Sequence, residues 1–298
     1  MQLGSVSSKR AEGDCVSRPN VSPDGVGRLG VPGWKNVDWL WHGFSTRRGG
    51  VSRVYLAGGQ IGPGELNLGF TAADAPENVR ENRLRFVGAV TGGRETPLRT
   101  VRQVHSNRSV TATQIAEETI AEADGLMTGQ AGVLLGIQTA DCIPVLVADP
   151  VRRAVAAFHA GWRGTVARIV ELGVSRMKQE FGSNPEDLIA AIGPGIEPCC
   201  YTVGVEVLDR FTEGFSYASE LFSQEVTNPE SRPDGSNIHL DLRVNLKEAN
   251  RRQLIAAGVA ADAITTVGGC TACQPDHFYS HRASGGHAGR MMAVIGIR

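Results

Sequence analysis

Runs of apolar residues separated by short polar turns dominate the centre of the chain. Residues 132–137, 143–148 and 154–158 are almost wholly apolar, a pattern typical of strands that are buried on both faces. Other short apolar or alternating segments predict further strands at residues 100–104, 109–113, 188–192, 263–267 and 291–297.

Longer segments with apolar residues three and four positions apart predict helices at residues 75–90, 165–181 and 242–257. Thr71 or Asp74 is expected to cap the first of them. Helices and strands interleave without strict βαβ spacing, so we expect an α/β or α+β fold with mixed sheets and flanking helices. We find no linker composition that would divide this part of the chain, which indicates a single domain.

The beginning of the chain has a different composition. Residues 1–30 are rich in Ser, Gly, Pro and charged side chains and show no apolar periodicity. We therefore expect residues 1–33 to be a disordered or loosely ordered extension and residues 34–298 to be the domain. The opening residues lack the continuous apolar segment of a signal peptide, and polar residues interrupt the longest apolar stretch, residues 132–147.

Composition narrows the class of function. The 298 residues include 30 Lys+Arg and 31 Asp+Glu, and this balance argues against nucleic acid or a membrane as the main partner. Glycine is frequent, at 37 residues, which fits tight turns around a small-molecule site. Six unevenly spaced cysteines are too few for a disulfide scaffold in a chain of this length. These features predict a cytoplasmic enzyme with reduced thiols and a small-molecule substrate.

His105, Cys142 and His159 each interrupt or end a predicted apolar strand. A thiolate and two imidazoles suit Zn²⁺, and three protein ligands leave the fourth position open for water. Such a water can become a nucleophile near neutral pH. The alternative is a buried cysteine with two unrelated histidines bonded to backbone. Spacing alone leaves both open, because the three residues spread over 55 positions.

The other cysteines show less favourable spacing for metal binding. Cys270, Cys273, His277 and His281 form a C-x2-C-x3-H-x3-H pattern, but zinc fingers usually separate their two ligand pairs by about 12 residues or more. We therefore do not expect these four residues to hold one metal ion. The adjacent pair at residues 199–200 is interpreted as tight packing, because neighbouring cysteines rarely reach disulfide geometry.

Arginines beside glycines are candidate anion sites. Arg47 lies in a glycine-containing turn, and Arg163 lies at the start of a predicted helix, where amide groups and a guanidinium can bind phosphate. The alternative is a solvated surface arginine. Asp124 and Asp141 are the carboxylates nearest in sequence to the metal ligands, and either can orient an imidazole or move protons. As an alternative, both are turn or cap residues.

Taken together, the motifs resemble the laccase-domain (YfiH-like) family from about His42 to the C-terminus. They are FSTRRGG (44–50), LNLG (66–69), QVHS (103–106), ADGLMT (123–128), TADCIPVLVAD (139–149), FHAGWRG (158–164), IGPGIEPCCYTVG (192–204) and CTACQPDHFYSHR (270–282). The resemblance implies a single α/β domain, related in architecture to cytotoxic necrotizing factor-like cysteine hydrolases. It also implies a zinc ion bound at His105, Cys142 and His159.

By the same resemblance, the substrate pocket includes Arg47, Asn67, Asp124, Arg163, Cys270 and Arg282. Family members often read Ser-Tyr-Arg-Arg where this chain has Ser280-His281-Arg282-Ala283. His281 can still donate a hydrogen bond to substrate, but the second arginine is missing. The family is associated with phosphorolysis of adenosine, inosine, guanosine and methylthioadenosine, and with adenosine deamination. It was first labelled as polyphenol oxidases, and some relatives are described as peptidoglycan-editing factors.

The histidine content helps to choose among these activities. A multicopper cluster needs many histidines, usually in His-x-His pairs, whereas this chain has seven histidines and no such pair. A single site can still take up Cu²⁺, which binds N/S ligands tightly. Our hypothesis is a zinc-dependent purine nucleoside enzyme with phosphate as co-substrate. Asp124 or Asp141 would carry protons, and Arg47, with Arg163 or Arg282, would hold phosphate.

Two other classes use the same residues. In a cysteine hydrolase acting on a peptidoglycan precursor, Cys142 would be the nucleophile and His159 or His105 the base. In a non-enzymatic binding protein, the pocket would hold a nucleotide without turnover. Metal content and sensitivity to thiol alkylation separate the hydrolase from the zinc enzyme, and tight ligand binding without turnover would favour the binding protein.

Overall fold

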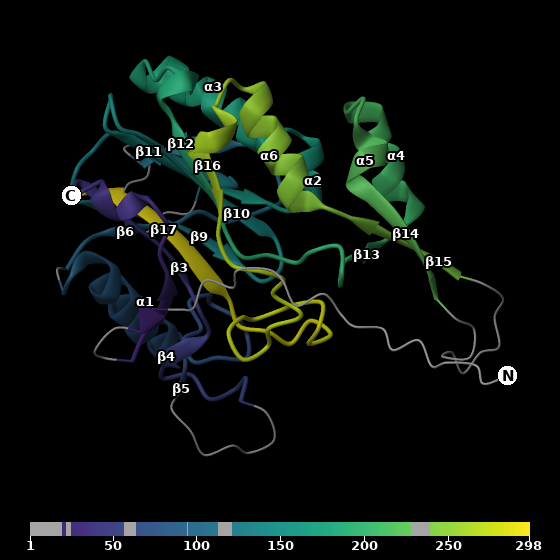
Figure 1. Ribbon diagram of the computed structural model, residues 1–298. Coiled ribbons are helices and arrows are strands. Elements are labelled where there is room, and N and C mark those ends of the chain that lie inside the picture. The colour runs from purple at the N-terminus through teal and green to yellow at the C-terminus, as the bar shows by residue number, and fades with distance from the viewer. Residues whose placement is uncertain (1–19, 22–24, 57–63, 94, 113–120, 228–238) are drawn as a thin grey trace, which may run out of the picture.

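Two mixed six-stranded sheets lie face to face between layers of helices (Figure 1). The computed structural model describes residues 20–21, 25–56, 64–93, 95–112, 121–227 and 239–298. The first sheet has the order β1 (Asn20–Val21), β2 (Gly27–Leu29), β3 (Leu40–Ser45), β17 (Met291–Ile297), β9 (Val133–Thr139) and β6 (Leu98–Arg99). The second has the order β16 (Ile264–Thr266), β12 (Ile189–Ile192), β10 (Ile143–Asp149), β11 (Ala154–Ala160), β8 (Gly125–Thr128) and β7 (Ser109–Thr111).

The central strands are apolar because both of their faces are covered. Every residue of β10, β11 and β17 is buried. Along β10, Leu146 and Ala148 face the core between the two sheets, while Val145 and Val147 face the helices outside. Successive strand side chains point to opposite faces, so a strand between two packed layers needs a continuous apolar run.

Helices cover the outer face of each sheet, which gives four layers. Helix α1 (Pro76–Thr91) packs Phe86 and Val90 on the first sheet. Helices α3 (Ile169–Phe181) and α6 (Leu246–Ala256) cover the second sheet, α3 with Val174 and Met177 (Figure 1). Burial of one such side chain stabilises the fold by roughly 1.5–3 kcal/mol.

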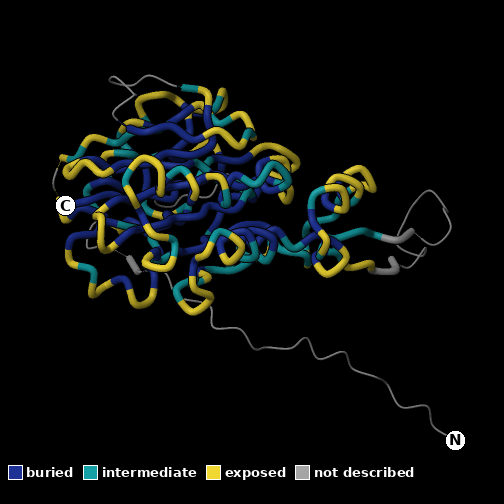
Figure 2. Tube along the Cα trace, turned by 90° about the horizontal axis from the view of Figure 1, so that it is seen from above, coloured by how far each residue is buried: buried dark blue, intermediate teal, exposed yellow. Residues whose placement is uncertain are grey.

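A smaller group of elements extends to one side of this body (Figure 2). It comprises α4 (Val205–Gly214), α5 (Ala218–Leu221), and the sheet of β13 (Thr202–Val203), β15 (His239–Val244) and β14 (Phe222–Thr227). The rings of Phe211, Phe215 and Phe222 pack together beneath the helices. A two-stranded sheet of β4 (Arg48–Gly50) and β5 (Gly64–Glu65) lies elsewhere, beside α1.

The fold confirms the expected α/β class with mixed sheets, but several elements differ from the sequence predictions. Residues 100–104 do not form the predicted strand, and only Arg102 makes an isolated bridge there. The amide of Val104 donates to a side-chain carboxylate instead of a ladder partner. The predicted helix at 242–257 begins only at Leu246, because residues 239–244 pair as β15. Helix α1 has Ala75 at its N-cap and receives no side-chain cap.

The predicted helix at 165–181 is broken in two. Helix α2 (Trp162–Val166) ends before Arg168, which has a φ of 60° and lies in the left-handed region. This conformation cannot continue a right-handed helix. The Arg168 guanidinium lies over the Phe215 ring and donates to the carbonyl of Gly214. These contacts connect the start of α3 to the end of α4.

Residues 25–33, which the sequence places in the predicted extension, pack against the domain in the structure. Strand β2 pairs with β3, and Val26 and Leu29 are fully or almost fully buried. Residues 1–19 and 22–24 of the predicted extension lie outside the described residues. Among the helices that the structure describes, none has the length and apolar character needed to cross a membrane.

Candidate metal centre

Three potential metal ligands converge at one edge of the second sheet. Cys142 immediately precedes β10, at the point where the chain passes from the first sheet to the second. His159 lies in β11, opposite Pro144 of β10. His105 comes from the connection between β6 and β7. The sheet therefore brings together residues that are far apart in sequence.

The ligand atoms are close enough to share one ion. The donor atoms of His105, Cys142 and His159 all lie within 4.8 Å of one another. The Cys142 Sγ is 3.8 Å from the His105 Nε2, and the two imidazole ring centres are 4.9 Å apart. A thiolate with two imidazoles is a donor set that zinc accepts, and copper also binds such N/S sites. The group therefore fits a single metal with one open position.

The carboxylate of Asp124 holds two of the three ligand residues by hydrogen bonds. It is fully buried, and its Oδ1 lies 2.8 Å from the His159 Nδ1. It also accepts hydrogen bonds from the amides of Val104, His105 and Ser106 and from the Ser106 hydroxyl. Because the Nδ1 of His159 is engaged with Asp124, the Nε2 is the nitrogen left to bind a metal.

The pKa values at the site favour charged groups despite burial. Burial would raise the pKa of Asp124, but hydrogen bonds from His159 and Ser106 outweigh it and lower that pKa to about 2. Burial likewise opposes ionisation of Cys142, yet the charge of His159 and the hydrogen bond to His105 lower its pKa to about 6. The His159 pKa is raised to about 9, against the effect of burial, by Cys142 and Asp124. The cysteine is thus held as a thiolate, the form that binds metals.

Backbone geometry around the ligands is constrained. His105 has a φ of 60° and Asp141 a φ of 90°, values in the left-handed region that non-glycine residues rarely adopt. Gly161 follows His159 closely, and a Cβ at this position would lie 2.9 Å from the His105 Cδ2 and 3.0 Å from the Cys142 Sγ. The ligands therefore pack directly against the Gly161 backbone.

Two exposed arginines and one tyrosine lie beside the metal group. Burial, and then the negative charge of Cys142, raise the pKa of Tyr201 to about 12, and the charges of Arg282 and Arg163 act in the opposite direction. The Arg282 guanidinium carbon lies 5.1 Å from the Tyr201 ring centre, and its Nη1 donates to the carbonyl of Thr202. The Arg163 guanidinium stacks on Trp162 at 4.5 Å. Tyr201 is thus a neutral phenol with two arginines, Asp141 and Cys142 around it.

Asp141, adjacent to Cys142, braces the neighbouring loop. Its Oδ1 accepts a 2.6 Å hydrogen bond from the Thr271 hydroxyl, and its Oδ2 accepts a 2.7 Å bond from the backbone N–H of Arg282. Both oxygens are thereby directed at the 270–282 loop, and the contacts fix the start of the Arg282 side chain.

Arg47 and Asn67 belong to separate hydrogen-bond networks. The Arg47 guanidinium forms a 2.6 Å ion pair with Glu65, donates to the carbonyls of Pro275 and Tyr55, and lies over the Tyr279 ring. Asn67 is fully buried, and its amide bonds to Gly69, Asp74 and Arg290. In this structure both side chains shape the loops around β4 and β5.

Cys270 lies in a second group, not with the three metal ligands. Its Sγ clusters with those of Cys199, Cys200 and Cys273. His281 is exposed, and its carbonyl accepts from the Gly286 amide. Among the described residues, Cys270 and Cys273 group with Cys199 and Cys200, a cluster that the interpretation of Cys199 and Cys200 as packing residues missed.

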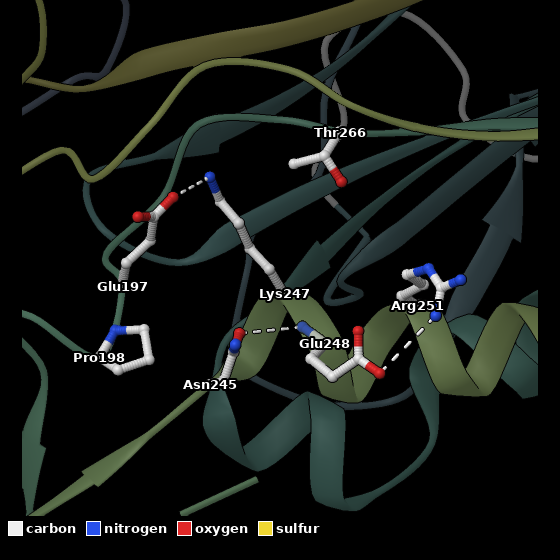
Figure 3. Close-up of a pocket in the computed structure, with 7 residues that line it drawn as sticks. All are labelled: Glu197, Pro198, Asn245, Lys247, Glu248, Arg251 and Thr266. Carbon is white, nitrogen blue, oxygen red and sulfur yellow. Dashed lines mark hydrogen bonds and ion pairs between the residues drawn. The ribbon is translucent and has the colours of Figure 1, made fainter. Parts of the chain in front are cut away.

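A hollow of about 250 Å³ near the cysteine cluster has paired charges on its walls (Figure 3). Lys247 forms a 2.6 Å ion pair with Glu197, and Arg251 lies 3.7 Å from Glu248. The Oδ1 of Asn245 caps α6 through the Glu248 amide. The hollow contains none of the three metal ligands, and its charged groups are already bound to each other.

The sequence did not predict two residues that lie near the metal group. Ser106 gives two hydrogen bonds to Asp124, and Tyr201 lies beside Arg282. Ser106 lies in the motif QVHS and Tyr201 in the motif IGPGIEPCCYTVG. Their position within these motifs is the sequence feature that could have indicated a place near the site. A serine or tyrosine alone carries no spacing that would indicate its partner.

Fold and site together define a mixed α/β protein with a His–Cys–His group able to hold one metal ion at a sheet edge. The chain belongs to the family described as multi-copper polyphenol oxidoreductase laccase, whose model matches residues 41–298. This result confirms the resemblance seen in the motifs.

Known relatives cover most of the chain. A protein of Deinococcus radiodurans named purine nucleoside phosphorylase is 40% identical over 256 residues, 86% of this chain and 88% of the relative. A protein of an unknown prokaryotic organism named adenosine deaminase RL5 is 36% identical over 179 residues, 60% of this chain and 64% of the relative. The crystal structure of YlmD from Geobacillus stearothermophilus superposes with a TM-score of 0.78 at 33% identity, covering 95% of this chain and 99% of that one. These names support an enzyme.

Proposed function

We propose that the protein is a zinc-dependent purine nucleoside enzyme that carries out phosphorolysis and adenosine deamination. The observation that carries the proposal is the hydrogen bond between the His159 Nδ1 and Asp124, which leaves the Nε2 for a metal shared with His105 and Cys142. The names of the relatives, purine nucleoside phosphorylase and adenosine deaminase, support the substrate class.

A bound zinc would supply Lewis acidity and an activated water at its open position. Asp124 is fully buried, accepts five hydrogen bonds and has a pKa of about 2, so its proposed role is to orient His159. Asp141 is assigned the positioning of Arg282 through its backbone N–H. These contacts favour orientation over the proton transfer that the sequence suggested for the two carboxylates.

Phosphate binding is assigned to Arg163 and Arg282. Both guanidinium groups are exposed beside the metal group, and their nearest aromatic neighbours leave most donors available to an anion. Arg47 is expected to contribute less to phosphate binding, because Glu65 already neutralises its charge in a 2.6 Å ion pair. Tyr201, which remains protonated at neutral pH, can donate a hydrogen bond to the departing base.

Phosphate dependence separates the two reactions and tests these assignments. In Arg163→Gln and Arg282→Gln variants, loss of a charged hydrogen bond of about 1.5–3 kcal/mol should raise the KM for phosphate roughly 10- to 150-fold. Deamination needs no phosphate and should keep its rate. Arg210→Gln is the control, because Arg210 pairs with Glu213 on the exposed face of α4. An unchanged KM for phosphate in both variants would contradict the assignment.

A cysteine hydrolase acting on a peptidoglycan precursor is the second candidate function. The observation in its favour is the low pKa of Cys142, about 6, with His105 and His159 in contact. A thiolate in such a setting is a competent nucleophile. Metal-free protein that hydrolyses the precursor and is inactivated by iodoacetamide would favour this reading. Protection of Cys142 from alkylation by bound zinc would favour the purine nucleoside enzyme.

Copper is the alternative metal, as the family description suggests. Among the described residues, two groups can hold a metal, and neither has the many histidines of a multicopper cluster. We therefore assign zinc as the working metal and Cu²⁺ as a competitor for the same three ligands.

A further inference from the structure

We propose that the protein has a second, structural zinc site formed by Cys199, Cys200, Cys270 and Cys273. Two of these residues come from the loop after β12 and two from the loop before β17. All four Sγ atoms lie within 4.8 Å of one another. The proposal is independent of the proposed function, because it concerns a different set of ligands.

The sulfur positions match a tetrahedral zinc. Zinc–thiolate bonds of about 2.3 Å place the four sulfurs of a tetrahedron about 3.8 Å apart. The Cys273 Sγ lies 3.5 Å from the Cys199 Sγ and 3.3 Å from the Cys200 Sγ, and all four thiols are free. These two separations are within about half an ångström of the tetrahedral value, and none of the other four exceeds 4.8 Å. Four thiolates without an open position define a structural site.

Backbone amides already point at one of the sulfurs. The Cys270 Sγ accepts from the N–H of Glu197, at 3.5 Å, and also from the N–H groups of Ala272 and Cys273. Amide N–H groups directed at the first sulfur of a C-x2-C turn stabilise that sulfur as a thiolate, the form that binds zinc. This observation is independent of the distances between the sulfurs.

The other thiols need a cation to ionise together. The Cys273 Sγ lies within 3.5 Å of both the Cys199 Sγ and the Cys200 Sγ. Thiolates crowded this closely repel one another unless a metal neutralises them. Positive charge is nearby, since the Arg243 guanidinium donates to the carbonyls of Pro198 and Cys199. Cys199 and Cys273 are exposed, which gives an ion a route into the site.

A metal at this site would hold the loops that shape the catalytic group. Tyr201 follows Cys200 directly, and Thr271 lies inside the C-x2-C turn with its hydroxyl on Asp141. Among the described residues, one isolated backbone bridge joins the two loops, and it pairs Gly195 with Cys270. A zinc bound to both loops would therefore add the cross-link that keeps Tyr201 beside Arg282.

Metal content of purified variants tests the proposal. Zinc per chain is measured by elemental analysis in the wild type, in a Cys199→Ser/Cys273→Ser double variant and in Cys142→Ala. The double variant should lose one zinc that Cys142→Ala retains. Ala272→Ser is the matched control, because it lies in the same turn, keeps its amide and supplies no thiol ligand. It should keep the full zinc content, and the double variant should have the lower Tm.

A second measurement does not depend on how well the double variant folds. Cobalt substituted into the Cys142→Ala protein should give the intense visible bands and sulfur-to-cobalt charge transfer of a tetrahedral tetrathiolate site. The proposal is overturned if this protein binds no cobalt through sulfur, or if the double variant keeps the wild-type zinc content. Iron in place of zinc would overturn it as well, and so would freshly reduced protein that binds no second metal.

Discussion

Replacing Asp124 with asparagine removes one charge from the centre of the metal site while keeping the shape of the side chain. The native carboxylate accepts five hydrogen bonds, three at Oδ2 and two at Oδ1. An asparagine offers one oxygen and one NH₂ group. With its oxygen at the Oδ2 position, the NH₂ faces the His105 amide and the His159 Nδ1.

The consequences follow from that mismatch. The His105 N–H loses its acceptor, which costs about 1–3 kcal/mol, and the remaining hydrogen bonds lose their charge, so the free energy of unfolding should fall by about 2–4 kcal/mol in total. His159 must accept at Nδ1 and carry its proton on Nε2, the nitrogen needed for the metal. Loss of such an orienting partner typically costs 10- to 100-fold in metal affinity.

Urea unfolding and zinc competition with a chelator measure the two effects. Asp149→Asn is the matched control, because Asp149 is another fully buried carboxylate whose Oδ1 accepts from the amides of Val151 and Arg152. That variant should keep the affinity of the His–Cys–His site for zinc, and an asparagine oxygen can keep both hydrogen bonds. If Asp124→Asn bound zinc as tightly as the wild type, the orienting role of Asp124 would be refuted.

Two further predictions concern packing and pH. Gly161→Ala should weaken zinc binding at the His105 and Cys142 ligands, since the new Cβ would lie within about 3 Å of both. Isothermal titration with zinc measures the effect. An unchanged affinity for zinc would contradict the packing argument. Burial, and then Arg28, lower the pKa of His42 from 6.5 to about 4. The unfolded chain therefore takes up this proton first, so stability should fall by up to about 3 kcal/mol as the pH drops from 6.5 to 4. His42→Gln should flatten this part of the stability curve in urea unfolding, and an equally steep curve would contradict the assignment.

The sequence predicted the buried centre of the fold well. Strands β9, β10, β11 and β17 appear where apolar runs placed them, because strands covered on both faces leave no ambiguity about which residues are buried. The predicted helix at 75–90 also appears, as α1. Elements whose residues depend on distant partners were harder to predict.

The failures have specific physical causes. Arg168 adopts a left-handed conformation because its guanidinium reaches the Gly214 carbonyl and the Phe215 ring, contacts that no local periodicity reveals. Residues 100–104 are apolar enough for a strand, but the buried carboxylate of Asp124 takes the amide of Val104 at the end of this segment. A long-range polar acceptor of this kind leaves no trace in the hydrophobic pattern.

The candidate site was predicted unevenly for the same reason. His105, Cys142 and His159 converge as the motifs suggested, although their spacing alone could not exclude unrelated roles. The cysteine cluster was missed, because adjacent cysteines and a short C-x2-C pair gave no sign of being neighbours across 70 residues of sequence. The backbone pairing of Gly195 with Cys270 brings those loops together.

The most direct test of the central claim pairs metal analysis with an adenosine-plus-phosphate assay on the same preparation, purified without added metal. The account predicts zinc in the wild-type protein, one zinc fewer in Cys142→Ala, and formation of inosine, adenine or hypoxanthine only by the protein whose His–Cys–His site is filled. A Cys142→Ala protein that lacks this zinc and still converts adenosine would contradict it. So would a wild-type protein with its three-ligand site filled by zinc that leaves nucleosides unchanged.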